Sequence, residues 1–411
     1  MNPIYNALVY ITWFASTYFV VLLLLAMYTK KDRLYEKKRI LKRIPKVSIV
    51  VPAFNEEKKI VHTIKSLKKI DYKNIEFIIV NDGSTDSTSK VVRKTIRNDK
   101  RFTFIDRQIN KGKAASLNEG IKRSQGKFVA CMDADSVVEP RIFYKALPYF
   151  DQKDVGAVTI SVGVKKPKNF LHKVIEIEYI IGLSLFLKIF SFFGSIFVTP
   201  GPFSIYRKSV LDKIKGFDCK SIVEDYEIAF RIHKAGYRIE NCLNGKVHTI
   251  VPPTFKEIYA QRKRWYSGAI YTMFKHHDIT FNKKLGTFGY FAPFNFFLIF
   301  LGMALFYAST FLATSRLFKG LKYYFYTGFN FFEHLLKFEI DLLATQQLTL
   351  IGVFAFILTV IVMLIGLKIT KNDIKKKKVG ILGFPFMFFL YQIFWTGAIF
   401  SVIFKRNIKW R

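Results

Sequence analysis

The sequence predicts an α/β domain, with a parallel sheet covered by helices on both faces, attached to about four membrane-spanning helices. Three observations lead to this expectation. Apolar runs long enough to cross a bilayer lie on either side of a middle region of mixed polarity. In that middle region short β-branched runs alternate with segments of helical spacing. Finally, 51% of the chain is hydrophobic although 23% is charged, so the two kinds of residue must be segregated along it.

The first apolar segment runs from about Ala7 to Tyr28 and contains no charged residue. About 20 apolar residues suffice to cross the hydrocarbon core, so residues 1–29 are expected to form an N-terminal transmembrane helix. Nine Lys or Arg residues lie between Lys30 and Lys46. Because cytoplasmic flanks of membrane helices are rich in Lys and Arg, residues 30–284 are expected to form a cytoplasmic domain.

Three further apolar spans run from Thr287 to Thr314, Leu348 to Ile369 and Val379 to Phe404, so residues 285–411 are expected to form a C-terminal transmembrane region. The lysine-rich loop 371–378 should face the cytoplasm. Four spans then leave the basic residues after Phe404 outside, against the positive-inside rule. Either one span is re-entrant, or the aromatic stretch from Tyr323 to Phe338 enters the membrane, and the sequence leaves both open.

The formal net charge is +35. Such a charge suits a nucleic-acid binder or a membrane protein with basic loops. The sharpest basic runs adjoin apolar spans and no nucleic-acid-binding motif is present, so membrane lipid is the expected partner and nucleic acid is not. The three cysteines, Cys131, Cys219 and Cys242, form no CxxC pair, which argues against a disulfide framework or a zinc site.

The middle region gives an ordered series of elements. The expected strands are Val47–Phe54, Phe77–Val80, Phe102–Ile105 and Phe128–Met132, and the expected helices are Glu57–Leu67, one capped by Ser84–Thr88, and Ala114–Ile121. A later apolar stretch from Ile180 to Val198 is interrupted by Lys188. It is either a buried helix or an amphipathic helix on the membrane surface.

Polar residues follow each of the four strands. They are Asn55-Glu56-Glu57, Asn81-Asp82-Gly83-Ser84, Asn110-Lys111-Gly112-Lys113 and Asp133-Ala134-Asp135. Each string alone is ordinary turn chemistry. Since ligands bind at the carboxyl ends of the strands in such sheets, four strings in register predict a shared binding edge.

Asp133 and Asp135 are two residues apart at a strand end, so both carboxylates can point to one divalent cation. Hard cations such as Mg²⁺ or Mn²⁺ prefer oxygen ligands and keep bound phosphates. The bland alternative is a solvated turn. Lys113 could neutralise diphosphate oxygens, or it could be one more surface lysine.

Glu224 and Asp225 precede an expected helix from Tyr226 to Ala235. An acidic pair at a helix start also suits the helix dipole. Asp225 is nevertheless a candidate general base, because hydroxyl attack on a sugar needs a positioned carboxylate.

Thr254 and Glu257 form a possible capping box at the start of another helix. On that helix Gln261, Arg264 and Trp265 share one face, since they fall at i, i+3 and i+4. A guanidinium beside an indole and an amide suits a pocket for a sugar on a diphosphate. Taken alone, the string could equally be a basic anchor beside the membrane.

Taken together these motifs resemble the inverting, membrane-integrated family 2 glycosyltransferases, which have a GT-A fold. The group includes hyaluronan, chitin, cellulose and poly-N-acetylglucosamine synthases. The resemblance rests on the order Asn-Asp-Gly-Ser, Asp-x-Asp, Glu-Asp and Gln-x-x-Arg-Trp, and covers about Pro45 to Gly268. Many relatives have Thr where this chain has Val223, before Glu224 and Asp225.

The resemblance implies a role for each matching residue. Asp225 would be the catalytic base, with Glu224 beside it in the catalytic pair, and Asp133 and Asp135 would hold the nucleotide and the metal, Mg²⁺ or Mn²⁺. The expected substrate-binding residues are Pro52, Asn55, Glu56, Asp82, Lys113, Asp133, Gln261, Arg264 and Trp265, with Glu56 and Asp82 on the uridine.

The expected function is inverting transfer of a sugar from a UDP-sugar, UDP-N-acetylglucosamine first among them, onto a growing β-linked polysaccharide at the plasma membrane. One alternative is a single-addition enzyme that acts on a lipid or polyprenyl carrier. An alternative of another class is an inactive membrane scaffold or carbohydrate-binding protein. Loss of Asp225 or of the Asp133/Asp135 pair would favour that last class, and all three carboxylates are present.

Overall fold

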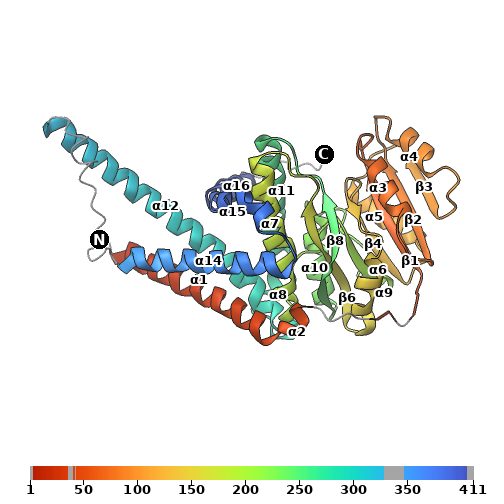
Figure 1. Ribbon diagram of the computed structural model, residues 1–411, viewed down its shortest axis with the longest axis horizontal. Helices are drawn as coiled ribbons and strands as arrows, with labels where there is room; N and C mark the ends of the chain where they lie inside the picture. The colour runs from red at the N-terminus through yellow and green to blue at the C-terminus, as the bar shows by residue number, and fades with distance from the viewer. Residues whose placement is uncertain (1–2, 36–39, 42, 328–346, 405–411) are drawn as a thin grey trace. The chain divides into compact units, whose positions relative to one another are not determined.

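The protein is described from a computed structural model that covers residues 3–35, 40–41, 43–327 and 347–404. It divides into two compact units. The first unit holds the long helices of residues 1–25 and 293–364, and the second holds the sheet, with residues 26–292 and 365–411. Figure 1 shows the elements of each.

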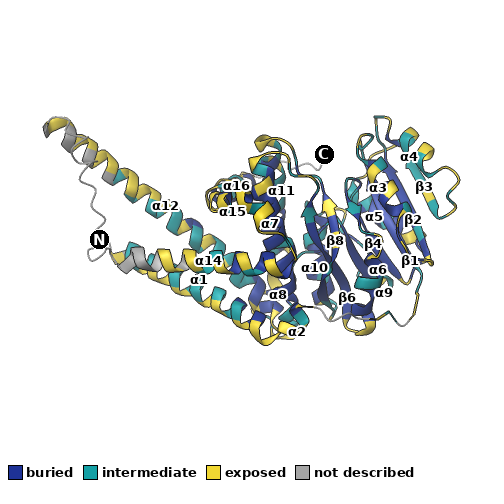
Figure 2. Cartoon of the chain, viewed as in Figure 1, coloured by how far each residue is buried: buried dark blue, intermediate teal, exposed yellow. Residues whose placement is uncertain are grey.

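The first half of the sheet follows the expected alternation. Strands β1 (Val47–Ala53), β2 (Ile75–Asp82), β3 (Phe102–Arg107) and β4 (Phe128–Cys131) run parallel in the order β3-β2-β1-β4. Helices α3 (Ile60–Lys68), α4 (Thr88–Ile96) and α5 (Lys113–Arg123) connect them. All seven residues of β1 are buried, so both faces of the sheet are covered there, as Figure 2 shows.

The second half corrects the expectation of a purely parallel sheet. Strand β7 (Ser204–Arg207) is antiparallel to both β4 and β6 (Val155–Val164), while β8 (Arg238–Thr249) is parallel to β6 and antiparallel to the short β5 (Val137–Val138). The eight-stranded sheet is therefore mixed, in the order β3-β2-β1-β4-β7-β6-β8-β5. The strand–helix alternation that indicates parallel pairing stops after β4. Beyond it, antiparallel pairs and long crossover connections join the strands.

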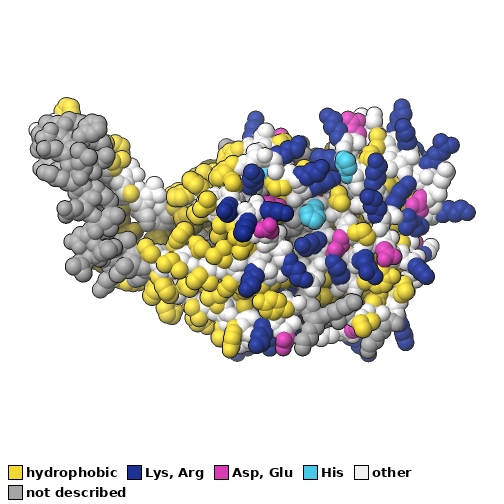
Figure 3. All heavy atoms as spheres, viewed as in Figure 1, with side chains coloured by type: hydrophobic (Ala, Val, Ile, Leu, Met, Phe, Trp, Pro, Cys, Tyr) yellow, Lys and Arg dark blue, Asp and Glu magenta, His cyan; other side chains and the backbone are white. Residues whose placement is uncertain are grey.

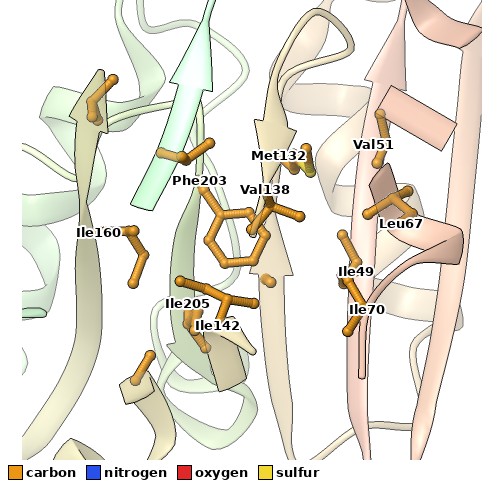
Figure 4. Close-up of a cluster of buried hydrophobic side chains, with 14 of the residues drawn as sticks. Ile49, Val51, Leu67, Ile70, Met132, Val138, Ile142, Ile160, Phe203 and Ile205 are labelled. Atoms are coloured by element: carbon orange, nitrogen blue, oxygen red, sulfur yellow. The ribbon is translucent and has the colours of Figure 1, made fainter. Parts of the chain in front are cut away.

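The sheet unit contains further helices. They are α2 (Lys31–Leu34), α6 (Ile142–Ala146), α7 (Phe170–Ile180), α8 (Leu187–Phe192), α9 (Lys208–Lys213), α10 (Glu224–Lys234) and α11 (Phe255–Lys275), with short turns at Leu147–Asp151, His277–Ile279, Lys283–Leu285 and Lys375–Lys377. The core lies against the sheet, where branched side chains from the strands, the helices and Phe203 interdigitate (Figure 4).

The apolar stretch after α7 is buried rather than laid on a surface. A π-helix, Ile181–Phe186, leads into α8, and Leu185, Leu187 and Ile189 are fully covered. Lys188 is 2% exposed because its ammonium donates to the hydroxyl of Tyr149 and the carbonyl oxygen of Asn241. The buried alternative is therefore confirmed, and the charge that suggested amphipathicity is satisfied inside the domain.

Three helices in the described part of the chain are long and apolar enough to cross a membrane. They are Tyr5–Thr29 within α1 (Pro3–Thr29), Phe288–Lys319 within α12 (Phe288–Thr327), and α16 (Phe386–Ile403). The expected span from Leu348 to Ile369 forms helix α14 (Gln347–Ile369). Its apolar segment Phe356–Ile369 is shorter than the three candidate spans. The expected last span is broken into α15 (Lys378–Gly383) and α16.

In the long-helix unit, α1 contacts α12. The hydroxyls of Tyr5 and Ser309 lie 3.2 Å apart, and the rings of Phe19 and Phe294 lie 6.1 Å apart, so α1 packs along α12. Most of the aromatic stretch from Tyr323 to Phe338, and the basic residues from Lys405 to Arg411, lie outside the described residues.

Candidate active site

The Asp133-Ala134-Asp135 turn follows β4 and is held in place by hydrogen bonds from other segments. The hydroxyl of Thr63, on α3, donates to the carbonyl oxygens of Ala134, at 2.7 Å, and of Ser136, at 2.8 Å. Thr249 donates its hydroxyl to Asp135 Oδ1 at 3.2 Å. Buried hydrogen-bond partners thus fix the turn, and with it the position of its two carboxylates.

Lys113 begins α5 and joins two of the predicted acids. Its Nζ lies 2.7 Å from Asp133 Oδ1 and 2.7 Å from Glu224 Oε1. Burial lowers the pKa of this lysine, but the charges of Asp133 and Glu224 raise it well above its usual value. Lys113 is therefore a half-buried cation inside an acidic cluster, not a free surface lysine.

Asp225 lies in the first turn of α10, and its main-chain and side-chain oxygens both accept hydrogen bonds. Gly201 N donates to Asp225 Oδ2 at 3.2 Å, and Thr199 donates both its N–H and its hydroxyl to the Asp225 carbonyl oxygen. Asp133 N in turn donates to Gly201 O. The segment 199–201 therefore links the two acids that the sequence places far apart.

The environment separates the protonation of the two neighbouring acids. Burial raises the pKa of Glu224, but the ion pair with Lys113 outweighs it and lowers that pKa below its usual value. Burial, and then the charge of Glu224, raise the pKa of Asp225 to about 7. Glu224 is thus an ionised partner of Lys113, while Asp225 can gain or lose a proton near neutral pH, as a general base must.

A single cavity brings these residues together. Pro52, Lys113, Asp133, Glu224 and Asp225 line it, together with Thr199, Gly201 and Tyr206. The last three were not predicted. Tyr206 donates its hydroxyl to Thr199 Oγ1 at 2.9 Å, which steadies the loop that holds Asp225. The only sequence signal was a Thr-Pro-Gly-Pro string ahead of a short strand, which reads equally well as a plain turn.

Three predicted residues at the first two strand ends hold loops in this structure. Asp82 is 1% exposed and accepts hydrogen bonds from Lys111 N, Gly112 N and Arg107 Nη1. Asn55 Oδ1 accepts from Thr85 N, and Glu56 N donates to the hydroxyl of Thr88. These contacts shape the edge where a nucleotide is expected. The sharp turn needs glycine at position 83, where φ is +68° and a Cβ would fall 2.6 Å from Asn110 N.

Helix α11 carries the Gln-x-x-Arg-Trp string, and Thr254 caps it by accepting from Glu257 N at 3.3 Å. The positive charge of Arg264 favours the ionised forms of both Glu224 and Asp225, although burial and Glu224 outweigh it at Asp225, where the pKa is raised overall. Gln261 and Trp265 are half-buried on the same helix. The unpredicted neighbour Arg262 is 2% exposed and stacks its guanidinium 4.3 Å from the Trp265 ring centre.

The residue that departs from the family pattern, Val223, faces α11 rather than the cavity. It is 5% exposed, and a Cβ built on Gly268 would lie 2.1 Å from its Cγ2. Glycine at position 268 therefore lets α11 approach the start of α10. The threonine hydroxyl that this chain lacks would therefore lie at the contact between α10 and α11 and not in the cavity.

The acids fit a divalent cation that shares its coordination with a nucleotide. Asp133 and Asp135 supply carboxylate oxygens at one strand end, and burial, and then the charge of Asp133, raise the pKa of Asp135 to about 6. Asp133 already pairs with Lys113, so Asp135 is the acid of the two whose charge is poorly compensated. Among the residues that the structure describes, no group of three or more His, Cys, Asp or Glu side chains could hold a metal alone, so donor phosphates would complete the shell, as is usual for Mg²⁺.

Comparison with known proteins supports this interpretation. Residues 48–215 match the family described as Glycosyl transferase family 2. Poly-beta-1,6-N-acetyl-D-glucosamine synthases from Staphylococcus epidermidis and Staphylococcus aureus (strain COL) are each 30% identical over 269 residues, which is 64% of this chain and 65% of the relative. The chain thus spans just under two thirds of the length of these curated relatives.

A solved structure resembles nearly the whole chain. The mannosyltransferase PcManGT from Pyrobaculum calidifontis, in complex with GDP-Man and Mn²⁺, superimposes with a TM-score of 0.63 at 18% identity and covers 97% of this chain and 100% of its own. The mixed sheet with its acidic edge is therefore the GT-A fold of nucleotide-sugar transferases. Within that class, residues 48–215 match the family 2 glycosyltransferases, and the chain resembles the polysaccharide synthases.

Proposed function

We propose that the protein is an inverting glycosyltransferase that moves a sugar from a UDP-sugar, most simply UDP-N-acetylglucosamine, onto a growing β-linked polysaccharide. The observation that carries the proposal is the half-buried carboxylate of Asp225, held by Gly201 N and with its pKa raised to about 7, in a cavity shared with Lys113 and Asp133. The names of the staphylococcal relatives support the choice of sugar and product.

The chemistry needs one displacement. The acceptor hydroxyl oxygen forms a bond to the anomeric carbon, the bond from that carbon to the diphosphate oxygen breaks, and the nucleoside diphosphate leaves. Asp225 takes the hydroxyl proton, and Glu224 stays ionised on Lys113. A single displacement inverts the anomeric carbon, which is why one base without a covalent nucleophile suffices.

Asp133 and Asp135 would hold Mg²⁺ or Mn²⁺, which would neutralise charge on the departing diphosphate. Lys113 brings a fixed positive charge to the same cavity, and Arg264 on α11 adds another close to the acids. We expect transfer to stop in excess EDTA and to return with added Mg²⁺ or Mn²⁺. Full turnover in EDTA would remove the metal from the proposal.

The direct test is to incubate membranes containing the protein with a panel of radiolabelled UDP-sugars and to measure the size of the labelled product. Label from UDP-N-acetylglucosamine in a long polymer, absent with the Asp225→Asn variant, is the expected result. A short product that partitions into organic solvent would identify the single-addition alternative on a lipid carrier. Absence of transfer from every donor would favour a scaffold or carbohydrate-binding role.

We further propose a multi-pass protein of the plasma membrane with the sheet unit in the cytoplasm, in accordance with the Lys30–Lys46 charge cluster. A single cysteine at Ser89 (Ser89→Cys), in a chain whose Cys131, Cys219 and Cys242 are replaced, should resist an impermeant maleimide in intact cells. It should react once the cells are opened. Labelling of intact cells would reverse the orientation.

A further inference from the structure

Helix α16 is long and apolar enough to qualify as a membrane span, yet it belongs to the compact unit that contains the sheet. It has 18 residues, which at ~1.5 Å per residue gives about 27 Å, barely the thickness of the hydrocarbon core. Its two faces differ: one is buried and the other exposed (Figure 2). The contacts of these faces bear on whether it crosses the bilayer.

The buried face packs against α11 along much of its length. The rings of Tyr266 and Trp395 stack 4.4 Å apart at an interplanar angle of 4°. Ser267 donates its hydroxyl to the carbonyl oxygen of Ala398, and a Cβ on Gly397 would lie 2.1 Å from the hydroxyl of Tyr259. This face is therefore covered by the sheet unit.

In the first half of α16 this face meets an ion pair between buried Arg262 and half-buried Glu178. Tyr391 donates its hydroxyl to Glu178 Oε1 at 3.0 Å, and Arg262 Nη2 lies 2.6 Å from Glu178 Oε2. If α16 crossed the bilayer, the pair would lie at the depth of the hydrocarbon core, where charged groups are costly. Beside a helix that lies at the membrane surface, the same pair stays near water.

The opposite face is apolar and exposed, and in the space-filling view hydrophobic side chains gather over α15 and α16 (Figure 3). Five large residues spaced three, four, seven and three apart are each 48–65% exposed: Phe386, Phe389, Ile393, Phe400 and Ile403. A stripe of this size requires a cover. Its width and polarity suit the acyl boundary of a bilayer.

In the sequence, basic residues flank α16 on both sides. Lys375 to Lys378 precede it, and four Lys or Arg residues lie between Lys405 and Arg411. A spanning helix would place one of these clusters outside, against the positive-inside rule. A helix lying in the interface keeps both clusters on one side, next to anionic lipid headgroups.

We propose that α16 lies in the membrane–water interface, with its apolar stripe in the acyl boundary and both of its ends on the side of the sheet unit. The spans are then α1, α12 and α14. The two spans α12 and α14 return the chain to the side of Lys30–Lys46, so Lys371–Lys378 and the basic residues after Phe404 all lie on that side. This removes the topological conflict that four spans create. The proposal does not depend on the reaction that the site catalyses.

The test uses the full chain without its native cysteines. Lys376→Cys and Phe404→Cys mark the two sides of α15–α16, and Tyr5→Cys and Lys31→Cys mark the ends of α1 as the matched control pair. An impermeant maleimide is applied to intact cells and to inverted vesicles. Positions 376 and 404 should react in the same preparation, whereas 5 and 31 should react in opposite ones. Reaction of 376 and 404 in opposite preparations would overturn the proposal.

A second measurement keeps the proposal falsifiable if that background folds poorly. Spin labels are placed at Phe389 and Phe400 in protein reconstituted into vesicles of phosphatidylglycerol and phosphatidylethanolamine. An interfacial helix gives both labels the same depth within a few ångströms. A spanning helix separates the two positions by about 16 Å, since eleven residues rise ~1.5 Å each. A depth difference of that size would refute the proposal.

Discussion

Two acids of α10, Asp225 and Glu227, are only two residues apart, yet their pKa values shift in opposite directions. Glu227 accepts from Arg231 Nε at 2.8 Å, Lys275 Nζ at 2.9 Å and His276 Nε2 at 3.1 Å. Burial raises its pKa, but these partners outweigh burial and lower the pKa of Glu227 to about 2. Asp225 has one backbone N–H on its carboxylate and an acid beside it, and its pKa rises to about 7.

The difference shows how an acid that stabilises the fold can be told apart from an acid that can exchange a proton, even when both lie on one helix. A carboxylate with several cationic partners is held ionised and fixes the junction of α10 with the end of α11. A carboxylate with too few partners is costly to ionise, and the proton it exchanges is available for chemistry. The following changes test this distinction.

The largest expected effect is that of Asp225→Asn. Transfer should fall by about 10² to 10⁴ because the amide keeps the shape and removes the base. UDP affinity should stay within about twofold. If Asp225 only caps α10, activity should instead be near normal, since Asn caps about as well as Asp. Label transfer and UDP binding, measured in parallel, separate the two interpretations.

The same variant should be more stable than the parent at pH 8. An acid whose pKa is higher in the folded than in the unfolded state costs stability once the pH exceeds its unfolded value. For Asp225 that cost develops between the ordinary pKa near 3.8 and about 7. A rise in thermal midpoint at pH 8 that disappears at low pH is the expected pattern.

Glu227→Gln should have the opposite profile. Removing one member of a buried ion network costs about 3 kcal/mol, at the low end of the usual range because Lys275 reaches solvent. The thermal midpoint should fall, while turnover per folded molecule stays within about twofold. Because the pKa of Glu227 is lowered, its contribution is present above pH 4.5 and is lost toward pH 2. A selective loss of turnover at unchanged stability would place Glu227 in the chemistry.

A smaller loss is expected from Gly268→Ala. The new methyl group meets Val223 Cγ2 and moves α11 away from the start of α10. Misplacement by about 1 Å can cost about 10²-fold in rate, and partial relaxation should leave a loss of about tenfold. The matched control is the double variant Gly268→Ala with Val223→Gly, which removes both Val223 Cγ2 and Val223 Cβ, at 2.1 and 2.8 Å from the added methyl group. Recovery of turnover in the double variant confirms the contact, and no recovery contradicts it.

The pH profile tests the protonation of Asp225 directly. Since a base must be deprotonated, kcat should rise about tenfold between pH 6 and pH 8, with an inflection near 7. Glu224→Gln removes a neighbouring negative charge, so the inflection should move to lower pH. A profile that stays flat from pH 6 to pH 8 would show that another group limits the rate.

The smallest effect is expected from Val223→Thr, which restores the residue found in many relatives. The side chain is buried against Gly268 and is nearly unchanged in size. Turnover and donor preference should change by less than about threefold, and stability should fall by about 1 kcal/mol because a hydroxyl becomes buried. A change of donor sugar would mean that this position faces the substrate after all.

Much of the catalytic half was predictable from local patterns. The continuous apolar runs of β1 and β2 and the strand-end strings around Asp133 follow rules of period and turn chemistry that act within a few residues. Asp133 and Lys113 were named from these strings, and the structure places both in one cavity. The loop of Thr199 and Gly201 was missed, because its role depends on contact with Asp225, more than twenty residues away.

By itself the sequence determined the strand–helix alternation, the apolar segments and the identity of the candidate acids, since these depend on spacing and side-chain type. Only the tertiary structure decided that β7 turns antiparallel, that Lys188 is satisfied inside the core, and that α16 packs against α11. It also gave Asp225 and Glu227 their opposite proton affinities. The physical reason is that burial and ionic partners come from segments distant along the chain, and no local pattern encodes them.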